Sequence, residues 1–218
     1  PICSLRWKAT TSPRRCRWLG CLRRNASQLV STVKIAFAGD SITASGNWAE
    51  AIDFAEVDNF AVSGDSTDAL FEMIPKITQS KPDIVSVLIG TNDFGNTLLN
   101  REGLDVGTRV LAIVEELKQQ SPKAKILLHT ILPRGIEDSG VDLRNRVIEA
   151  NDYIKSNKPS DIEFIDLWAD FVAPDGLSLA DQYVMTDEPI LKLHLNENGY
   201  QKWITVLLPT LQRMINAR

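Results

Sequence analysis

The residues best suited to chemistry lie in five short patches spread along the chain. In order they are Gly39-Asp40-Ser41, Asn59 leading to Ser63-Gly64-Asp65, Gly90-Thr91-Asn92-Asp93, Leu132-Pro133-Arg134-Gly135, and His194 followed by Asn196-Glu197-Asn198-Gly199. A Gly-Asp-Ser triplet alone carries little information, because turns favour the same residues. Their order is more informative, since a serine, a backbone donor, an amide donor and a late histidine supply the groups that acyl transfer requires.

An alternating pattern of strands and helices would position these patches. Five apolar segments are long enough for strands and apolar enough to be buried on both faces of a parallel sheet: 33–38, 57–62, 84–89, 125–131 and 162–167. Helical spacing predicts helices over about 66–80, 104–120 and 142–157. The alternation predicts a three-layer α/β/α domain with a flavodoxin-like, doubly wound, five-stranded parallel sheet.

The patches follow the expected strands. Ser41 follows the first strand, Gly64 the second and Asn92 the third, while Pro133 and Arg134 follow the fourth. In open parallel sheets, ligands bind beyond the carboxyl ends of the strands. We therefore expect these patches to meet at one edge of the sheet.

A last helix is expected to begin at Asn196, which is a good N-cap residue, with Glu197 in the first turn. Pro209 should kink this helix or end its first part. His194 then lies in a short loop directly before a helix, which is a rigid position for a catalytic base.

Charge is distributed unevenly over the 218 residues. Residues 1–32 hold seven of the 24 Lys and Arg residues, none of the 28 Asp and Glu residues, and all three cysteines. We interpret this basic segment as an extension outside the fold, either a targeting peptide or sequence foreign to the domain. The cysteine spacing does not fit a zinc site. Residues 33–218 are then one domain.

The body of the chain is acidic, which argues against nucleic acid as the natural partner. No apolar run approaches the roughly 20 residues that cross a bilayer, so stable membrane insertion is not expected. The sequence predicts a soluble domain with a cytoplasmic location and a small-molecule substrate.

Over about 33–218 the chain resembles the SGNH hydrolase superfamily, the GDSL lipases and esterases. The patch at Gly90-Thr91-Asn92-Asp93 and the segment from Asn59 to Gly64-Asp65-Ser66 carry the resemblance. It implies that Ser41 is the nucleophile and that the N–H groups of Ser41 and Gly64, with the Asn92 amide, hold the oxyanion. It implies neither a metal nor an organic cofactor. Leu132-Pro133-Arg134-Gly135 resembles platelet-activating-factor acetylhydrolase-like members, which points to small acyl groups.

Each of these residues also has a purely structural interpretation. Ser41 could cap a helix, Gly64 could be a turn glycine with positive φ, and Asn92 could bond local backbone at a strand end. Of the two histidines in the chain, His129 lies inside an apolar strand, where neighbours would satisfy it. His194 is therefore the expected base, by elimination as well as by resemblance.

The third member of a catalytic triad is uncertain. The family usually carries Asp three residues before the histidine, where this chain has Leu191. If residues 188–191 bulge out as an insertion, Asp187 restores the usual Asp-x-x-His order in space. Other possibilities are a Ser–His dyad oriented by a backbone carbonyl, or another acid such as Glu188 or Asp181.

The expected function is that of a carboxylic ester hydrolase acting through a Ser41 acyl-enzyme on short-chain acyl or acetyl esters. One alternative is a flavodoxin-like protein that binds phosphate or FMN at the loop Ser41-Ile42-Thr43, although Asp40 and Asp65 would repel phosphate there. The other is a family member without activity, which Leu191 makes conceivable.

Overall fold

Five parallel strands form one sheet in the computed structural model, which describes residues 32–95, 99–137 and 139–217. They are β1 (Lys34–Gly39), β2 (Glu56–Asn59), β3 (Ile84–Leu88), β4 (Lys125–His129) and β5 (Glu163–Ile165), in the spatial order β2-β1-β3-β4-β5. This order is the flavodoxin-like, doubly wound arrangement, so the predicted fold class is confirmed. Residues 1–31, which make up nearly all of the predicted extension, lie outside the described residues.

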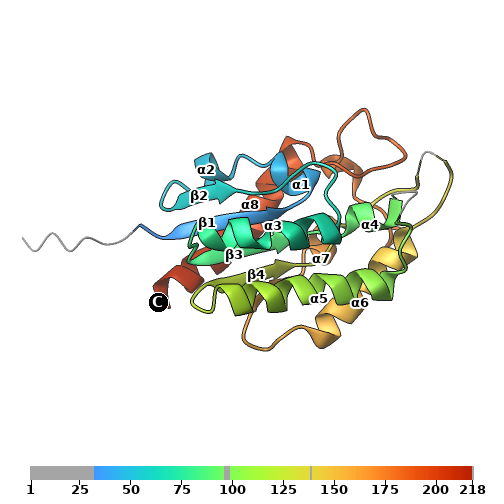
Figure 1. The fold of residues 1–218 in the computed structure, drawn as a ribbon. Helices are drawn as coiled ribbons and strands as arrows, with labels where there is room; N and C mark the ends of the chain where they lie inside the picture. The colour runs from blue at the N-terminus through green and yellow to red at the C-terminus, as the bar shows by residue number, and fades with distance from the viewer. Residues whose placement is uncertain (1–31, 96–98, 138, 218) are drawn as a thin grey trace, which may run out of the picture. The chain divides into compact units, whose positions relative to one another are not determined.

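Helices cover both faces of the sheet. On one face are α3 (Thr67–Gln79), α5 (Gly103–Gln120) and α6 (Arg144–Asn157), and on the other are α2 (Trp48–Ala51), α7 (Trp168–Phe171) and α8 (Glu197–Asn216). Three further short helices lie in loops: α1 (Ser41–Ala44), α4 (Thr91–Gly95) and the 3-10 helix η1 (Asp181–Tyr183). In Figure 1, α3 and α5 lie on the near side of the sheet and α8 on the far side.

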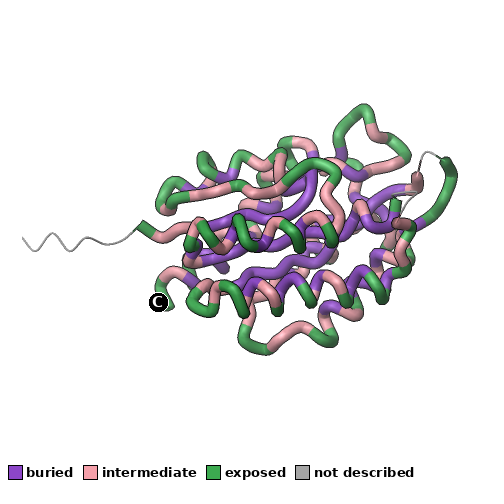
Figure 2. Tube along the Cα trace, viewed as in Figure 1, coloured by how far each residue is buried: buried purple, intermediate pink, exposed green. Residues whose placement is uncertain are grey.

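The period-two alternation of strand side chains divides the core between these faces. In β1, Ala36 and Ala38 pack with α3, α5 and α6, whereas Ile35 and Phe37 pack with α2 and α8. The small alanines leave room for helices on one side, and Phe37 stacks on the Trp48 ring at 4.5 Å between centroids on the other. In Figure 2 the central strands are coloured as buried, and the elements around them are partly exposed.

The expectation that all five strands are buried on both faces is wrong for the two edges. Strands β1, β3 and β4 are buried, but β2 and β5 are largely half-exposed and shorter than the predicted segments. An edge strand has a neighbour on only one side, and its position at the edge is set by tertiary arrangement rather than by its own composition.

The last helix begins as expected, because the Asn196 side chain caps α8 by accepting a hydrogen bond from the Gly199 N–H at 3.0 Å. However, α8 continues past Pro209 to Asn216. Pro209 has no N–H, so the Thr205 carbonyl loses its usual hydrogen-bond partner in the helix. Both residues lie on the exposed face of α8, where water can bond to that carbonyl. Within the described residues, none of the helices combines the length and apolar character needed to cross a bilayer.

Candidate active site

Ser41 is the first residue of α1, one turn of helix that begins directly after β1. Its predecessor Asp40 is the N-cap, and the Asp40 carboxylate accepts a hydrogen bond from the Ile42 N–H at 3.0 Å. As the first helical residue, Ser41 has a backbone N–H with no acceptor inside the helix. The capping role that Ser41 could have played therefore belongs to Asp40, and the hydroxyl of Ser41 is left for other partners.

The short helix α1 is fixed by side chains from three other elements. The Tyr200 hydroxyl of α8 donates to the Ile42 carbonyl at 2.8 Å, and the Trp48 indole N–H donates to the Thr43 carbonyl at 2.7 Å. Asn59, at the end of β2, donates to the same turn at 3.3–3.4 Å. These bonds satisfy the carbonyls at the C-terminal end of α1, so a helix of only four residues holds Ser41 in one position.

His194 contacts the hydroxyl of Ser41, although the two residues are 153 positions apart in the sequence. The distance from Ser41 Oγ to His194 Nε2 is 2.9 Å. The His194 side chain is 30% exposed, so solvent and small molecules can reach the ring. The pair therefore has the geometry of a nucleophile and its general base.

Glu188 supplies the carboxylate on the other side of the histidine ring. Its Oε1 is hydrogen-bonded to His194 Nδ1, and its Oε2 accepts hydrogen bonds from the backbone N–H groups of His194 at 2.9 Å and Leu193 at 3.0 Å. Burial opposes ionisation of Glu188, but these hydrogen bonds outweigh it and hold the Glu188 pKa below its usual value. An ionised Glu188 fixes Nδ1 as the protonated nitrogen, which leaves Nε2 free to accept a proton from Ser41.

The expectation that Asp187 faces the histidine is thereby corrected. The single Nδ1 hydrogen of His194 goes to Glu188, and Asp187 is exposed on the loop surface. The loop turns sharply after Glu188, because the Lys192 N–H donates to the Glu188 carbonyl at 3.1 Å and Lys192 has φ 42°. This turn directs the glutamate inward. Asp181, the other acid considered, is instead paired with Lys192.

A second segment holds this loop in place. The backbone N–H of Gly135 donates to the Leu191 carbonyl at 2.7 Å, and the N–H of Ile136 donates to the Ile190 carbonyl at 3.1 Å. The contact is so close that a Cβ at Gly135 would lie 1.9 Å from the Ile190 carbonyl oxygen. Ile190 and Leu191 thus pair with the segment after β4, and the acid that reaches His194 is Glu188, without the insertion that Asp187 would have required.

Gly64 and Asn92 lie on two neighbouring loops. Gly64 has φ 87°, a conformation that favours glycine, and a Cβ there would meet open space. Its N–H donates to no other group within the described residues, so it can bond an incoming oxygen. Asn92 uses its amide to donate to the Asp65 carbonyl at 2.9 Å, and within the described residues the second N–H of that amide donates to no other group.

A cavity of about 220 Å³ adjoins both residues. It is lined by Gly64, Thr91, Asn92, Gly95, Arg134, Glu137, Leu191 and Leu193. Arg134 is 3% exposed and pairs with Glu137, and it also donates to the Thr91 carbonyl at 3.1 Å. Leu193 directly precedes His194, so the cavity lies between the candidate oxyanion donors and the histidine loop.

The second histidine is in the core, as predicted. His129 ends β4, is 1% exposed, and its Nε2 is 2.8 Å from Ser86 Oγ. Burial lowers the His129 pKa to about 3, so the ring is neutral at physiological pH.

Asp40 is the buried acid nearest in sequence to Ser41. It is fully buried, and its Oδ2 has no hydrogen-bond partner in the described part of the chain. Burial raises the Asp40 pKa to about 7.

Comparison with known proteins identifies the family. A model of the GDSL-like lipase/acylhydrolase family matches residues 37–202, about three-quarters of the chain. The chain belongs to this family, and the resemblance inferred from the five patches is confirmed. Membership also sets aside a flavodoxin-like flavin-binding protein, although the sheet order is shared.

Individual relatives agree with this assignment. The chain is 28% identical over 177 residues to platelet-activating factor acetylhydrolase IB subunit alpha2 of Gallus gallus, covering 77% of this chain and 71% of that protein. A GDSL-like lipase from Bacteroides thetaiotaomicron has the same fold, with a TM-score of 0.71 at 18% identity over 85% of this chain and 89% of its own. A carbohydrate esterase family 3 structure from Talaromyces cellulolyticus gives a TM-score of 0.63 at 18% identity over 86% of this chain and 100% of its own.

Proposed function

We propose that this protein is a carboxylic ester hydrolase that acts through an acyl-enzyme on Ser41 and prefers esters of short acyl groups. The observation that carries the proposal is the continuous hydrogen-bonded series Ser41–His194–Glu188. A cavity bordered by Gly64, Asn92 and Leu193, the residue before His194, supports it. Family membership agrees, since lipases and acylhydrolases cleave esters.

In the first half of the reaction, Ser41 Oγ attacks the acyl carbon while His194 Nε2 takes the hydroxyl proton. The N–H groups of Ser41 and Gly64, with the Asn92 amide, stabilise the negative oxygen of the tetrahedral intermediate. His194 then gives its proton to the leaving alcohol as the ester C–O bond breaks. Glu188 keeps the ring oriented and stabilises the imidazolium in between.

The second half repeats these steps with water. His194 Nε2 takes a proton from the water as its oxygen attacks the acyl carbon of the Ser41 ester. Collapse of the second tetrahedral intermediate breaks the bond to Ser41 Oγ, which recovers a proton from His194. The products are a carboxylic acid and the free enzyme, so no cofactor is needed for the balance of the reaction.

The cavity supports the preference for short acyl groups. Leu191 and Leu193 offer an apolar surface for the first carbon atoms, but Arg134 and Glu137 also line the same 220 Å³. A long alkyl chain would have to lie against this ion pair, and displacing the water around charged groups without replacing its hydrogen bonds is costly. The relative named platelet-activating factor acetylhydrolase acts, by its name, on an acetyl group.

A panel of p-nitrophenyl esters from acetate to octanoate tests both parts of the proposal. We expect kcat/KM to be highest between acetate and butyrate and to fall for longer chains. A fluorophosphonate probe should label the wild-type protein at Ser41. Absence of both hydrolysis and labelling would overturn the proposed function, whereas a preference for octanoate would overturn only the acyl-group assignment.

Asn92→Ala tests the oxyanion assignment. We expect a loss of about 10²–10³ in kcat, which is typical when one oxyanion donor is removed. A loss below about threefold would leave Asn92 with only its bond to the Asp65 carbonyl, which is a structural role.

A further inference from the structure

The two loops that carry the proposed oxyanion donors are joined by one buried carboxylate. Asp93, directly after Asn92, is fully buried. Its Oδ2 accepts a hydrogen bond from the Thr67 N–H at 2.9 Å, and its Oδ1 accepts one from the Thr67 hydroxyl at 2.6 Å. Thr67 begins α3, three residues after Gly64. Together with the bond from Asn92 to the Asp65 carbonyl, Asp93 ties the two loops at a second point.

Arg101 supplies the positive charge that this carboxylate requires. Its Nη1 lies 2.5 Å from Asp93 Oδ1 and 3.4 Å from the Thr67 hydroxyl, and its backbone N–H donates to the Asp93 carbonyl at 3.0 Å. A buried carboxylate without a cation is strongly destabilising, and it relieves the cost by taking up a proton or by moving toward water. Either change would disturb the bonds between Asp93 and Thr67.

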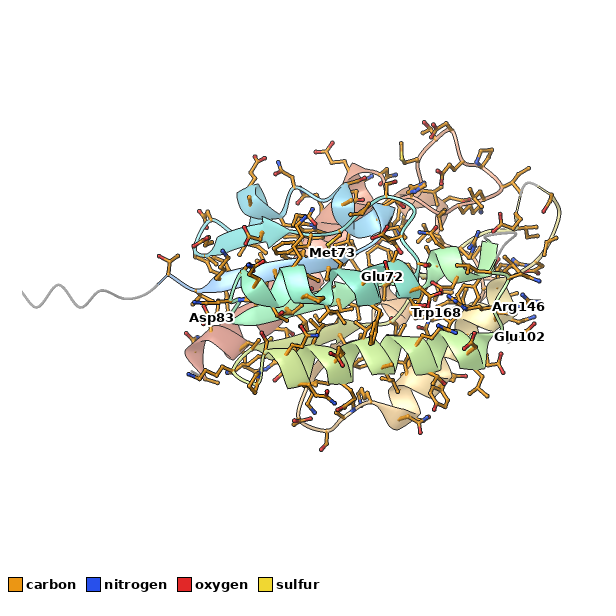
Figure 3. All side chains as sticks on the ribbon, viewed as in Figure 1. Glu72, Met73, Asp83, Glu102, Arg146 and Trp168 are labelled. Carbon is orange, nitrogen blue, oxygen red and sulfur yellow. The ribbon has the colours of Figure 1, made fainter. Side chains whose placement is uncertain are left out.

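Arg101 itself is held from several directions. Its Nη2 pairs with Asp68 at 2.5 Å, and its Nε lies 3.4 Å from Asp105. Behind it, Nη1 of Arg146 in α6 donates to the Arg101 carbonyl at 3.3 Å, and Nη2 of Arg146 pairs with Glu102 at 3.1 Å. Figure 3 shows Arg146 and Glu102 side by side at this end of the molecule. The Arg101 side chain is 11% exposed, so its guanidinium has little freedom to leave Asp93.

We propose that Arg101 is a positioning residue for the oxyanion hole, acting through Asp93 and Thr67 on the separation of Gly64 and Asn92. The inference rests on the proposed function and adds to it a residue that contacts neither substrate nor the reacting atoms. The oxyanion forms only as the reaction proceeds, so a misplaced donor weakens transition-state binding more than substrate binding. Loss of Arg101 should therefore lower kcat with little change in KM.

The chain offers a matched control in Arg109. Its Nη1 pairs with Asp68 at 2.6 Å and its Nε with Asp105 at 3.0 Å, the same two acids that Arg101 contacts. Within the described residues it makes no contact with Asp93. Arg109→Ala thus removes a comparable share of the surface ion-pair network and leaves the buried carboxylate paired. The difference between the two alanine variants isolates the contact with Asp93.

The experiment compares wild type, Arg101→Ala, Arg101→Lys and Arg109→Ala on p-nitrophenyl acetate. For Arg101→Ala we expect kcat to fall about tenfold to a hundredfold, the scale of a displacement near 1 Å at a reacting centre, with KM within about threefold. Affinity for a short trifluoromethyl ketone, whose adduct with Ser41 carries an oxyanion, should fall by a similar factor. Arg109→Ala should stay within about twofold of wild type.

Arg101→Lys keeps the charge but lacks the planar fork, so we expect partial rescue. It also provides a test if the alanine variant does not fold. Equal kcat losses for Arg101→Ala and Arg109→Ala would overturn the inference, and so would a wild-type kcat in Arg101→Ala. If Arg101→Ala is insoluble, the lysine variant decides. A folded Arg101→Lys with no loss of kcat would then overturn the inference. A wild-type protein that neither hydrolyses esters nor reacts with fluorophosphonate at Ser41 would instead remove the proposed function, and this inference with it.

Discussion

The protein contains two Ser–His pairs with almost the same contact. Ser41 Oγ lies 2.9 Å from His194 Nε2, and Ser86 Oγ lies 2.8 Å from His129 Nε2. Judged by this distance alone, either pair could be a nucleophile with its base. The surroundings of the two imidazole rings differ in two respects.

The first difference is the partner of Nδ1. In His194 this nitrogen is hydrogen-bonded to Glu188, whereas His129 Nδ1 is buried and has no partner in the described part of the chain. A carboxylate at Nδ1 selects the tautomer whose Nε2 accepts a proton and stabilises the imidazolium that results. Without it, and with its pKa lowered to about 3 by burial, His129 cannot hold a proton taken from Ser86 near neutral pH.

The second difference is access. The His194 side chain is 30% exposed and Ser41 is 7% exposed, whereas His129 is 1% and Ser86 2% exposed. His129 also packs edge-to-face on Trp203 at 5.6 Å. The Ser86–His129 bond satisfies two polar groups that the central strands bury. The comparison shows that a Ser–His contact can be purely structural, and that a carboxylate partner and a more accessible imidazole ring set the catalytic candidate apart.

Replacing each serine by alanine should give the largest contrast. Ser41→Ala should abolish ester hydrolysis and fluorophosphonate labelling while leaving the fold intact. Ser86→Ala should retain activity but lose about 1–3 kcal/mol of stability, because His129 Nε2 is then buried without a partner. Activity assays and denaturant unfolding measure both. Esterase activity that survives Ser41→Ala would reverse the assignment of the two pairs.

Removal of the carboxylate is the next largest effect. Glu188→Gln should lower kcat by about 10²–10⁴, by analogy with the roughly 10⁴-fold loss for the aspartate of serine proteases. The matched control is Asp187→Asn, which neutralises the adjacent, exposed acid and should cost less than about threefold. The kcat of both variants on p-nitrophenyl acetate decides between them. A large loss for Asp187→Asn with a small one for Glu188→Gln would contradict the geometry.

The contact of Glu188 with His194 could not be predicted from the sequence, whereas the sheet and the other proposed site residues could. The apolar strands and helical periods were sufficient for a parallel sheet between two layers of helices, since burial leaves a clear signature in the central strands. They were not sufficient for the extent and burial of the two edge strands. Strand ends converge at one edge, so Gly64 and Asn92 could be expected around one site, and they line one cavity. Ser41 and His194 could likewise be expected to meet, and they do.

The Glu188 contact depends on information that no local pattern contains. Its direction is set by the turn closed at Lys192 and by the pairing of Ile190 and Leu191 with Gly135 and the residue after it, more than 50 positions earlier. The sequence placed an acid near His194 but left three arrangements open. Arg101 was missed for a similar reason, because its role follows from the buried environment of Asp93 and not from a motif.

Gly135→Ala tests the support of this loop with a smaller expected effect. A Cβ at this position would meet the Ile190 carbonyl at 1.9 Å, so the loop that carries Glu188 must shift. We expect kcat to fall about tenfold or more, as for other displacements near a reacting centre. Gly140→Ala serves as a control on the same segment, because a Cβ there meets nothing within 4 Å, although its φ of 83° carries some strain. Equal activities in the two variants would show that the Gly135 contact does not position Glu188.

The smallest expected effect is on the pH dependence of the free energy of unfolding. His129, and Asp40 beside Ser41, should change it in opposite directions. His129 has a pKa near 3 when folded and 6.5 when unfolded, so between these values the unfolded chain binds the extra proton and stability rises with pH. Asp40, next to Ser41, has the opposite behaviour. Its pKa is about 7 when folded and 3.8 when unfolded, so between these values the folded protein binds the extra proton and stability falls as pH rises.

The two contributions oppose each other between about pH 4 and pH 6.5. Each has a slope of up to about 1.4 kcal/mol per pH unit, so variants that remove one should reveal the other. We expect unfolding free energies of His129→Gln, measured by denaturant at pH 4.5 and 6, to fall with pH relative to wild type, and those of Asp40→Asn to rise. The other titrating groups are common to all three proteins and cancel in the comparison. If His129→Gln keeps the wild-type slope, the His129 ring binds the same number of protons in the folded and unfolded protein between pH 4.5 and 6. The contrast between the two histidines would then be left to access and to the carboxylate at Nδ1.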